Sequence, residues 1–134
     1  MEKLRIIIDW TPNNFAAAPA DDSIACVATG ASLDDIKKNI VEAIKFHVDG
    51  LREYGDAVPA VLAGEWKPEF ELTARAALKA CEAYITRKAL AHETGINEQQ
   101  LCHYASGLKE PRPATRKKIA DGIRSISRRL AEIR

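Results

Sequence analysis

Three short apolar runs open the chain, and each has the pattern of a β-strand. Residues 4–10, Leu-Arg-Ile-Ile-Ile-Asp-Trp, are β-branched and dense enough for a buried strand. Residues 11–14, Thr-Pro-Asn-Asn, are turn formers, so we expect residues 15–18 to return as the second strand of a hairpin. Residues 24–29 predict a third strand, which ends at Gly30. The pattern therefore predicts a small antiparallel sheet.

An apolar stripe over residues 33–54 predicts one long amphipathic helix. Ser32 is placed to cap it, and Asp34 and Asp35 fall in the first turn, where the helix dipole favours anions. Because so small a sheet is unstable alone, we expect this helix to cover it. The stripe recurs at three- and four-residue steps through Leu33, Ile36, Ile40, Ile44, Val48 and Leu51.

The middle of the chain carries a weaker pattern. Residues 55–63 contain a proline and no helical period, which predicts a loop. Residues 66–73 alternate apolar and polar side chains, as a half-buried strand does. Pro68 favours an edge position or a start at Glu69. Two pairings stay open: this strand completes the first sheet, or it pairs with its copy in a second subunit.

The remainder of the chain is predicted to be helical. Residues 74–84 are alanine-rich, residues 86–112 have the pattern of two short helices, and residues 114–134 predict a long final helix after Pro111 and Pro113. The final helix bears one apolar stripe, which is interpreted as core or, alternatively, as a dimer seam. That stripe consists of Ile119, Ile123, Ile126, Leu130 and Ile133.

Each end of the two short helices carries a residue suited to its geometry. Thr86 can cap the first helix, and Gly95 can end it in the left-handed conformation. Asn97 begins the second helix with Gln100 three residues on, as in a capping box, and Gly107 ends it. Two short helices joined by such a turn are the arrangement that places a second helix in the DNA major groove.

Charge separates the two halves of the chain. The whole chain has a net charge of +1, but residues 1–64 carry 6 Lys/Arg against 10 Asp/Glu, and residues 65–134 carry 14 against 9. A basic half suits a polyanion, and an acidic half suits a different partner. We therefore expect two domains, residues 1–64 and residues 65–134, and an α+β fold in which the small sheet and its helix precede an all-α domain.

The exposed first turn of the second short helix predicts the residues that contact DNA. Glutamine can bond adenine through two contacts, and glutamate can accept from the cytosine amino group. The expected base-reading residues are Glu98, Gln99, Gln100 and His103, whereas Leu90, Leu101, Tyr104 and Ala105 are expected to face the core. The expected phosphate-binding residues are Arg87, Lys88, Lys109 and Arg112.

Three widely spaced cysteines, Cys26, Cys81 and Cys102, argue against a disulfide framework. Cys102 beside His103 lacks a second pair at metal-ligand spacing, so we interpret it as a small buried thiol next to an exposed histidine and expect no metal or other cofactor. The sequence has no signal-peptide pattern and no apolar run of about 20 residues, the length that a membrane span needs. A location in the cytoplasm is expected.

Taken together, the chain resembles the HicB-type antitoxins of bacterial toxin–antitoxin pairs over most of its length. The order of strand, turn, strand, strand and helix carries the likeness through residues 6–8, 13–15, 26–30 and 33–35. Residues 19–26 depart from the Pro-Asp-Leu-Pro-Gly-Cys-like segment usual in the family. The C-terminal part resembles the helix-turn-helix of phage-repressor-like regulators in Leu90-Ala91, Thr94-Gly95, Tyr104 and Ser106-Gly107.

The resemblance implies a partial ribonuclease-H-like first domain that binds a small ribonuclease toxin (HicA-like) and blocks it. It also implies a helix-turn-helix domain that dimerises, or forms a higher even oligomer, on operator DNA and represses the toxin–antitoxin genes, bringing the protein to the nucleoid. An acidic first half would suit a basic RNA-cutting partner. Trp10 and Phe15 flank the first turn and are candidate toxin contacts, with a role in the core as the alternative for each.

Two other functions fit parts of the sequence. A metal-dependent nuclease would use Asp9, Asp21 and Asp22, but no further carboxylate is placed to complete a two-metal cluster, so we expect a binding protein rather than an enzyme. A stand-alone repressor would bind a small ligand in its first domain. A neighbouring gene for a small basic protein would favour the antitoxin over this alternative.

Overall fold

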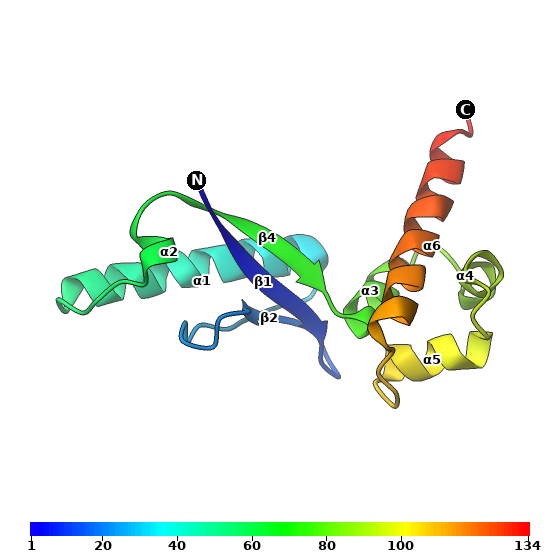
Figure 1. Cartoon of the computed structure of the whole chain (residues 1–134), viewed down its shortest axis with the longest axis horizontal. Helices are drawn as coiled ribbons and strands as arrows, with labels where there is room; N and C mark the ends of the chain where they lie inside the picture. The colour runs from blue at the N-terminus through cyan, green and yellow to red at the C-terminus, as the bar shows by residue number, and fades with distance from the viewer. The chain divides into compact units, whose positions relative to one another are not determined.

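Four strands form the sheet at the start of the chain, which the computed structural model describes over all 134 residues. Their order is β3-β2-β1-β4. Figure 1 labels three of them, β2, β1 and β4. Neighbours β1–β2 and β2–β3 are antiparallel, whereas β4 is parallel to β1, so the sheet is mixed rather than antiparallel. The strands are β1 (Glu2–Trp10), β2 (Phe15–Pro19), β3 (Ala28–Gly30) and β4 (Trp66–Leu72).

Strand β4 completes the first sheet within one chain. It begins at Trp66, and Pro68 lies opposite Leu4. The proline is tolerated because β4 is an edge strand with one neighbour. The chain accordingly divides into two compact units after Thr73, whereas the sequence suggests a division after Gly64. We call them the N-terminal unit (residues 1–73) and the C-terminal unit (residues 74–134).

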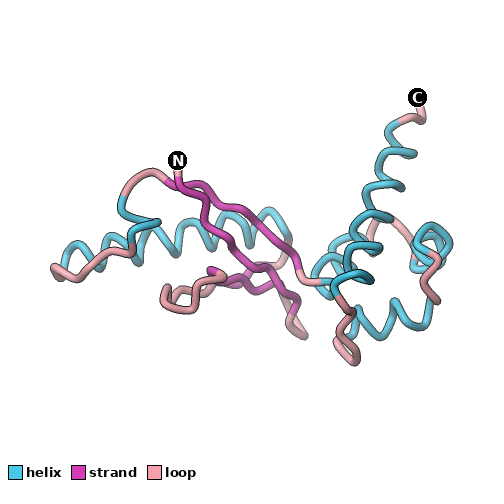
Figure 2. Tube along the Cα trace, in the orientation of Figure 1, coloured by secondary structure: helices cyan, strands magenta, loops and turns pink.

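Helix α1 (Leu33–Glu53) covers one face of this sheet (Figure 2). Its start matches the prediction, because the Ser32 hydroxyl accepts a hydrogen bond of 3.1 Å from the Asp35 N–H. Gly30 lets the helix approach β3 closely, since a Cβ at this position would lie 2.7 Å from the Ile36 nitrogen. The core between helix and sheet contains Leu4, Ile6, Ile8, Phe15, Ala17, Ile36, Ile40, Ile44 and Val48.

Two segments of the N-terminal unit differ from the predicted pattern. Strand β3 is shorter than expected because the Cys26 N–H bonds to the Ile24 carbonyl, which takes it out of the strand ladder. The segment expected as a loop contains the one-turn helix α2 (Ala60–Ala63), in which Leu62 is 1% exposed. The Arg52 guanidinium donates to the last carbonyl of that turn, at Ala63.

The C-terminal unit consists of four helices with their own core. They are α3 (Ala74–Cys81), α4 (Arg87–Thr94), α5 (Glu98–Ser106) and α6 (Pro113–Ala131). Helix α3 ends before the expected Tyr84, which is exposed. The core is formed by Ala74, Leu78, Leu90, Leu101, Tyr104 and Ile119, with Ala105 packed against it, so the expected core side of α4 and α5 is confirmed.

Helices α4 and α6 approach closely at a glycine. A Cβ on Gly122 would overlap the Thr94 methyl group and touch Leu90. This contact turns the predicted apolar stripe of α6 toward the core, where Ile119 is buried. None of the six helices combines the length and the hydrophobicity that crossing a bilayer requires.

Candidate nucleic-acid interface

The turn between α4 and α5 is held by caps on both sides. The Thr86 hydroxyl accepts a hydrogen bond of 3.0 Å from the Ala89 N–H at the start of α4. Gly95 ends that helix with φ 74°, a left-handed conformation that costs glycine little. The Asn97 side chain then accepts from the Gln99 N–H at 2.8 Å and starts α5. The three predicted cap residues are confirmed.

The expected capping box is absent, and this changes the role of Gln100. Its side-chain amide donates to the Tyr104 hydroxyl at 2.8 Å instead of reaching back to Asn97. Tyr104 is buried in the core, so its hydroxyl needs a partner and Gln100 provides one. Gln100 is therefore half-buried and engaged along α5, unlike a free base-reading side chain.

The exposed face of α5 consists of Glu98, Gln99, Cys102 and Ser106. The expectation for the Cys102–His103 pair was wrong, because the thiol is exposed and the histidine is half-buried. The Nδ1 atom of His103 is buried without a hydrogen-bond partner. Among the four predicted base-reading residues, Glu98 and Gln99 project freely from the first turn, and His103 lies at the edge of the exposed face.

Three of the four predicted phosphate-binding cations are exposed and form no ion pair. They are Lys88 on α4, Lys109 after α5, and Arg112 at the start of α6. The Lys109 N–H bonds to the His103 carbonyl, which holds the connecting segment against the end of α5. Helix α6 begins without a side-chain cap, so its first N–H groups are available to an anion.

Arg87 has a structural role that the sequence did not reveal. Its guanidinium donates to the Leu78 carbonyl at 3.3 Å and to the Glu82 carboxylate at 3.4 Å. Only 17% of this side chain is exposed. Arg87 therefore ties the end of α3 to the start of α4, and it is not placed as a free phosphate contact.

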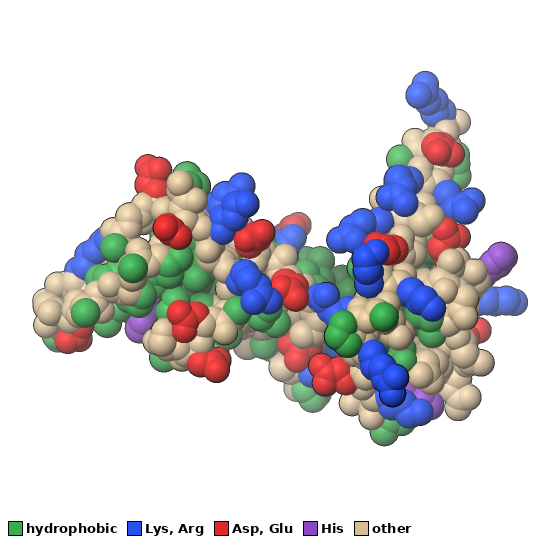
Figure 3. Space-filling view, in the orientation of Figure 1, with side chains coloured by type: hydrophobic (Ala, Val, Ile, Leu, Met, Phe, Trp, Pro, Cys, Tyr) green, Lys and Arg blue, Asp and Glu red, His purple; other side chains and the backbone are tan.

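The C-terminal unit is strongly basic once the boundary is set after Thr73. It carries 13 Lys/Arg against 6 Asp/Glu, a net charge of +7, whereas the N-terminal unit carries 7 against 13, a net of −6. Lys and Arg side chains are spread over the visible face of the C-terminal unit (Figure 3). A polyanion is therefore attracted to residues 74–134 and repelled by residues 1–73.

A hydrogen bond and an ion pair to Glu93 join α4 to α6. The Ser125 hydroxyl donates to the Glu93 carboxylate, and the Arg129 guanidinium lies 3.4 Å from the same oxygen. The hydrogen bond from Ser125, with the nearby charge of Arg129, holds the pKa of Glu93 below its usual range. These two contacts hold α6 against α4.

The apolar stripe of α6 continues beyond the core. Ile119 is buried, and Ile123 and Ile126 pack against the core, but Leu130 is 53% exposed and Ile133 is 74% exposed. Leu130 in the last turn of α6 and Ile133, two residues after the helix ends at Ala131, therefore present apolar side chains to solvent near the cations of the helix. Such a surface is available to a partner helix.

The candidate toxin contacts at the first turn are mostly internal. Phe15 is 5% exposed and belongs to the core, so the alternative expectation of a core role is correct for it. Trp10 is half-buried and packs edge-on against Phe15, with 4.9 Å between ring centroids. Neither ring is placed as an exposed anchor.

The carboxylates of the nuclease alternative do not converge. Asp9 accepts from the Thr73 hydroxyl at 2.7 Å and from the Trp10 N–H, and Asp21 accepts from Ser23 within its own turn. No group of three or more His, Cys, Asp or Glu side chains has the geometry of a metal site.

Comparison with known proteins found no match to a family model, a curated protein or a solved structure.

Proposed function

We propose that this chain is a sequence-specific DNA-binding repressor of the HicB antitoxin type. In this proposal the C-terminal unit reads an operator, and the N-terminal unit binds and neutralises a small ribonuclease toxin in the bacterial cytoplasm. One observation carries it: the exposed first turn of α5 lies in a strongly basic unit, between cations that have no partner within the chain.

In the proposed complex, α4 and α5 act as a helix-turn-helix and α5 enters the major groove. Gln99 bonds an adenine edge, and Glu98 accepts from a cytosine amino group. Lys88, Lys109 and Arg112 bind phosphates and set the position of α5 without reading sequence. His103, at the edge of the exposed face, contributes through its outer ring atoms.

Dimerisation belongs to the same proposal. The exposed Leu130 in the last turn of α6 and Ile133 just after the helix offer an apolar contact between two copies. A two-fold dimer would place two α5 helices on half-sites about one helical turn apart, which predicts a palindromic operator. Higher even oligomers would use this dimer as their unit.

The proposed family assignment is supported by the topology of the N-terminal unit. The strand order β3-β2-β1-β4, with α1 between β3 and β4, is compatible with the partial ribonuclease-H-like domain that the resemblance implies. The acidic character of this unit suits a basic, RNA-binding partner through charge complementarity.

A ligand-responsive repressor is the second candidate function. It is favoured by a hollow of about 440 Å³ in the N-terminal unit, between α1 and residues 25–27, because this volume lies in the range of small-molecule sites. The two candidates share the operator-binding unit and differ in what the N-terminal unit binds.

Selection of binding sites from random duplex DNA tests the repressor. Gln99→Ala should keep most of the affinity and lose base preference at one position of each half-site, because one base contact is removed. Gln100→Ala is the matched control, since that amide is bound to Tyr104 and should read no base. Absence of any selected sequence with the wild-type chain, or unchanged specificity in Gln99→Ala, would contradict the proposed role of α5.

A further inference from the structure

The two ring nitrogens of His103 on α5 have different surroundings. Nδ1 is buried and has no hydrogen-bond partner. Nε2 also has no partner within the chain, but it is not buried. The residue as a whole is half-buried. One edge of the imidazole is therefore closed off by the protein, whereas Nε2 remains open to a ligand.

The backbone of His103 is held by the turn that ends α5. Its carbonyl accepts a hydrogen bond of 3.1 Å from the Ser106 hydroxyl and one of 3.3 Å from the Lys109 N–H. The same hydroxyl accepts from the Leu108 N–H at 3.4 Å, and Gly107 ends the helix with φ 81°. The ring is therefore attached to a well-fixed part of the helix, and the Ser106 hydroxyl is already engaged.

The buried nitrogen decides where the neutral ring carries its proton. A neutral imidazole has one N–H donor, on either Nδ1 or Nε2. A proton on Nδ1 would be a buried N–H without an acceptor, and such groups are rarer in proteins than unpaired acceptors. A proton on Nε2 leaves only a lone pair at the buried position and keeps the donor accessible. The structure therefore favours the tautomer of His103 that has its N–H on Nε2.

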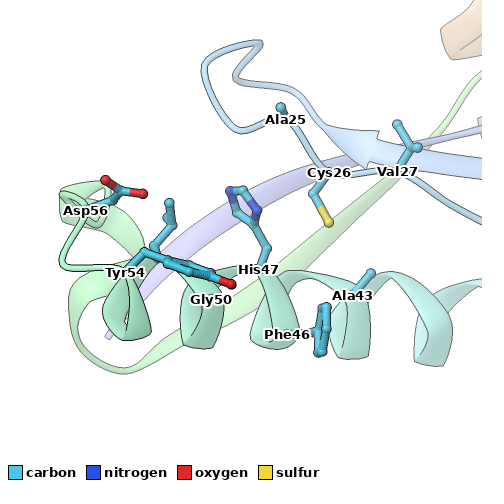
Figure 4. Close-up of a pocket in the computed structure, with 10 residues that line it drawn as sticks. Ala25, Cys26, Val27, Ala43, Phe46, His47, Gly50, Tyr54 and Asp56 are labelled. Atoms are coloured by element: carbon cyan, nitrogen blue, oxygen red, sulfur yellow. The ribbon is translucent and has the colours of Figure 1, made fainter.

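His47 in the N-terminal unit provides a contrast. This residue is also half-buried, but its imidazole extends from α1 into the hollow beside residues 25–27 (Figure 4). Neither of its ring nitrogens is buried without a partner. The surroundings of His47 therefore do not select one tautomer in the way that those of His103 do.

His103 lies on the side of α5 that reads bases in the proposed function. Gln99 precedes it by four residues, so the two side chains share one side of the helix. In the major groove guanine presents two acceptors, O6 and N7, whereas adenine presents N7 beside an amino donor. An N–H donor without an accompanying acceptor therefore suits guanine best.

We propose that His103 is a specificity-determining residue, which donates its Nε2–H to the O6/N7 edge of a guanine in the half-site that Gln99 reads. The inference rests on the proposed function for operator binding and adds the identity of a second base. Because glutamine suits adenine, the two side chains together predict an adenine and a guanine close together in each half-site.

A phosphate oxygen is the other acceptor that DNA offers to this donor. A phosphate contact would strengthen binding to every sequence and select no base. The exposed cations Lys88, Lys109 and Arg112 are suited to phosphates, whereas His103 shares its side of α5 with Gln99. The base edge is therefore the favoured acceptor, and the experiment separates the two.

The probe is the operator site that the full wild-type chain selects from random duplex DNA, with affinity measured by fluorescence anisotropy. Changing the selected guanine to adenine should weaken wild-type binding about 2- to 10-fold, the effect of losing one hydrogen bond. In His103→Ala the same base change should have no effect. His103→Gln keeps an N–H donor and should retain part of the preference. His92→Ala, which removes an exposed histidine from α4, is the matched control and should keep the full preference.

Nitrogen-15 NMR of the full chain tests the tautomer directly, because long-range correlations identify the protonated nitrogen of each imidazole. We expect His103 to carry its N–H on Nε2 before DNA is added. His47 and His92 serve as references in the same spectrum. A proton mainly on Nδ1 of His103 would overturn the inference.

The outcomes separate this inference from the proposed function. A selected operator without guanine in the half-site, or a guanine preference that survives in His103→Ala, would overturn the role of His103 while the repressor stands. Equal weakening of all sequences in His103→Ala would assign the ring to a phosphate and overturn base reading by it. If the wild-type chain selects no sequence, the proposed function and this inference both fall.

Discussion

The two units of this chain carry opposite net charges, and in each unit some residues of the less common sign are held by contacts within the unit. In the N-terminal unit, two of the four cations of α1 contact neighbouring elements, because Lys37 lies over the Phe70 ring and Arg52 donates to the Ala63 carbonyl. In the C-terminal unit, Glu93 and Asp121 are bound by Ser, Lys or Arg side chains, and other cations remain in solvent. Because an ion pair removes one charge of each sign, these contacts leave the net charges of the two units unchanged at −6 and +7.

The size of this contrast depends on where the boundary between the two units lies. Moving the boundary from Gly64 to Thr73 assigns four more charged residues to the N-terminal unit, three of them glutamates: Glu65, Lys67, Glu69 and Glu71. The N-terminal unit becomes more acidic and the C-terminal unit more basic. In the proposed function, this difference in charge lets DNA and a basic toxin be bound by different units of one chain.

The largest expected effect concerns the separate cores of the two units. Leu101→Ala should destabilise the C-terminal unit by about 2–5 kcal/mol, because Leu101 is fully buried and its truncation leaves a cavity. The chain's two tryptophans, Trp10 and Trp66, both lie in the N-terminal unit, so their fluorescence follows that unit alone. Circular dichroism should show the C-terminal unit unfolding at a lower denaturant concentration than in the wild-type chain. The unfolding transition followed by tryptophan fluorescence should be unchanged. Leu108→Ala, at a 70% exposed position, is the control.

The reverse experiment targets the N-terminal unit. Gly30→Ala should destabilise it by about 1–3 kcal/mol, because the new methyl group meets the backbone of Ile36 and neither element can give way cheaply. Tryptophan fluorescence in a urea titration measures the loss. Gly64→Ala has no atom within 4 Å of the new Cβ and should be near neutral. Equal losses in the two variants would rule out the close approach of β3 and α1.

A smaller effect compares two exposed lysines of opposite units. Lys109→Ala should weaken binding to all DNA sequences several-fold and lower the salt slope of log K by about 1, because one phosphate contact is removed. Lys38→Ala removes the same charge from α1 and should change neither quantity. Fluorescence anisotropy with labelled duplex over a salt series measures both. An equal loss in the two variants would point to net charge instead of a local contact.

The smallest expected effect is a pH dependence in the C-terminal unit. The lowered pKa of Glu93 in the folded chain means that its bonds to Ser125 and Arg129 stabilise the fold above the unfolded pKa. This contribution is lost as pH falls through the folded pKa. Glu93→Gln should therefore be less stable than wild type at pH 7, and the difference should vanish on acidification. Glu110→Gln, at an exposed site, should show no such convergence.

Local signals in the sequence predicted local structure well. Ser32, Thr86 and Asn97 cap their helices as expected, because a cap depends on residues one to three positions away. The apolar stripe of α1 likewise predicted which side of the helix is buried. These features need no information about distant parts of the chain.

The features that the sequence did not predict are of two kinds. Some depend on contacts between residues far apart in sequence, and others depend on which of two neighbouring residues of a helix is the more exposed. Cys102 and His103 flank the core side of α5 symmetrically, so periodicity alone does not decide which of them is the more exposed. Arg87 donates to the carbonyl of Leu78 in the last turn of α3, a contact between residues nine positions apart that depends on α3 ending at Cys81. The parallel pairing of β4 with β1 has no local signal at all.

That parallel pairing has a consequence for how the protein is made. The partners of β1 on one side lie far along the chain: Arg5 bonds Glu71 and Asp9 bonds Thr73, at separations of 66 and 64 residues. During synthesis, the first strand lacks these partners until the chain up to Thr73 has left the ribosome. Until then one edge of β1 is unpaired. Contacts between residues so far apart in sequence also form slowly. The N-terminal unit therefore acquires its fourth strand only when the ribosome has begun the C-terminal unit.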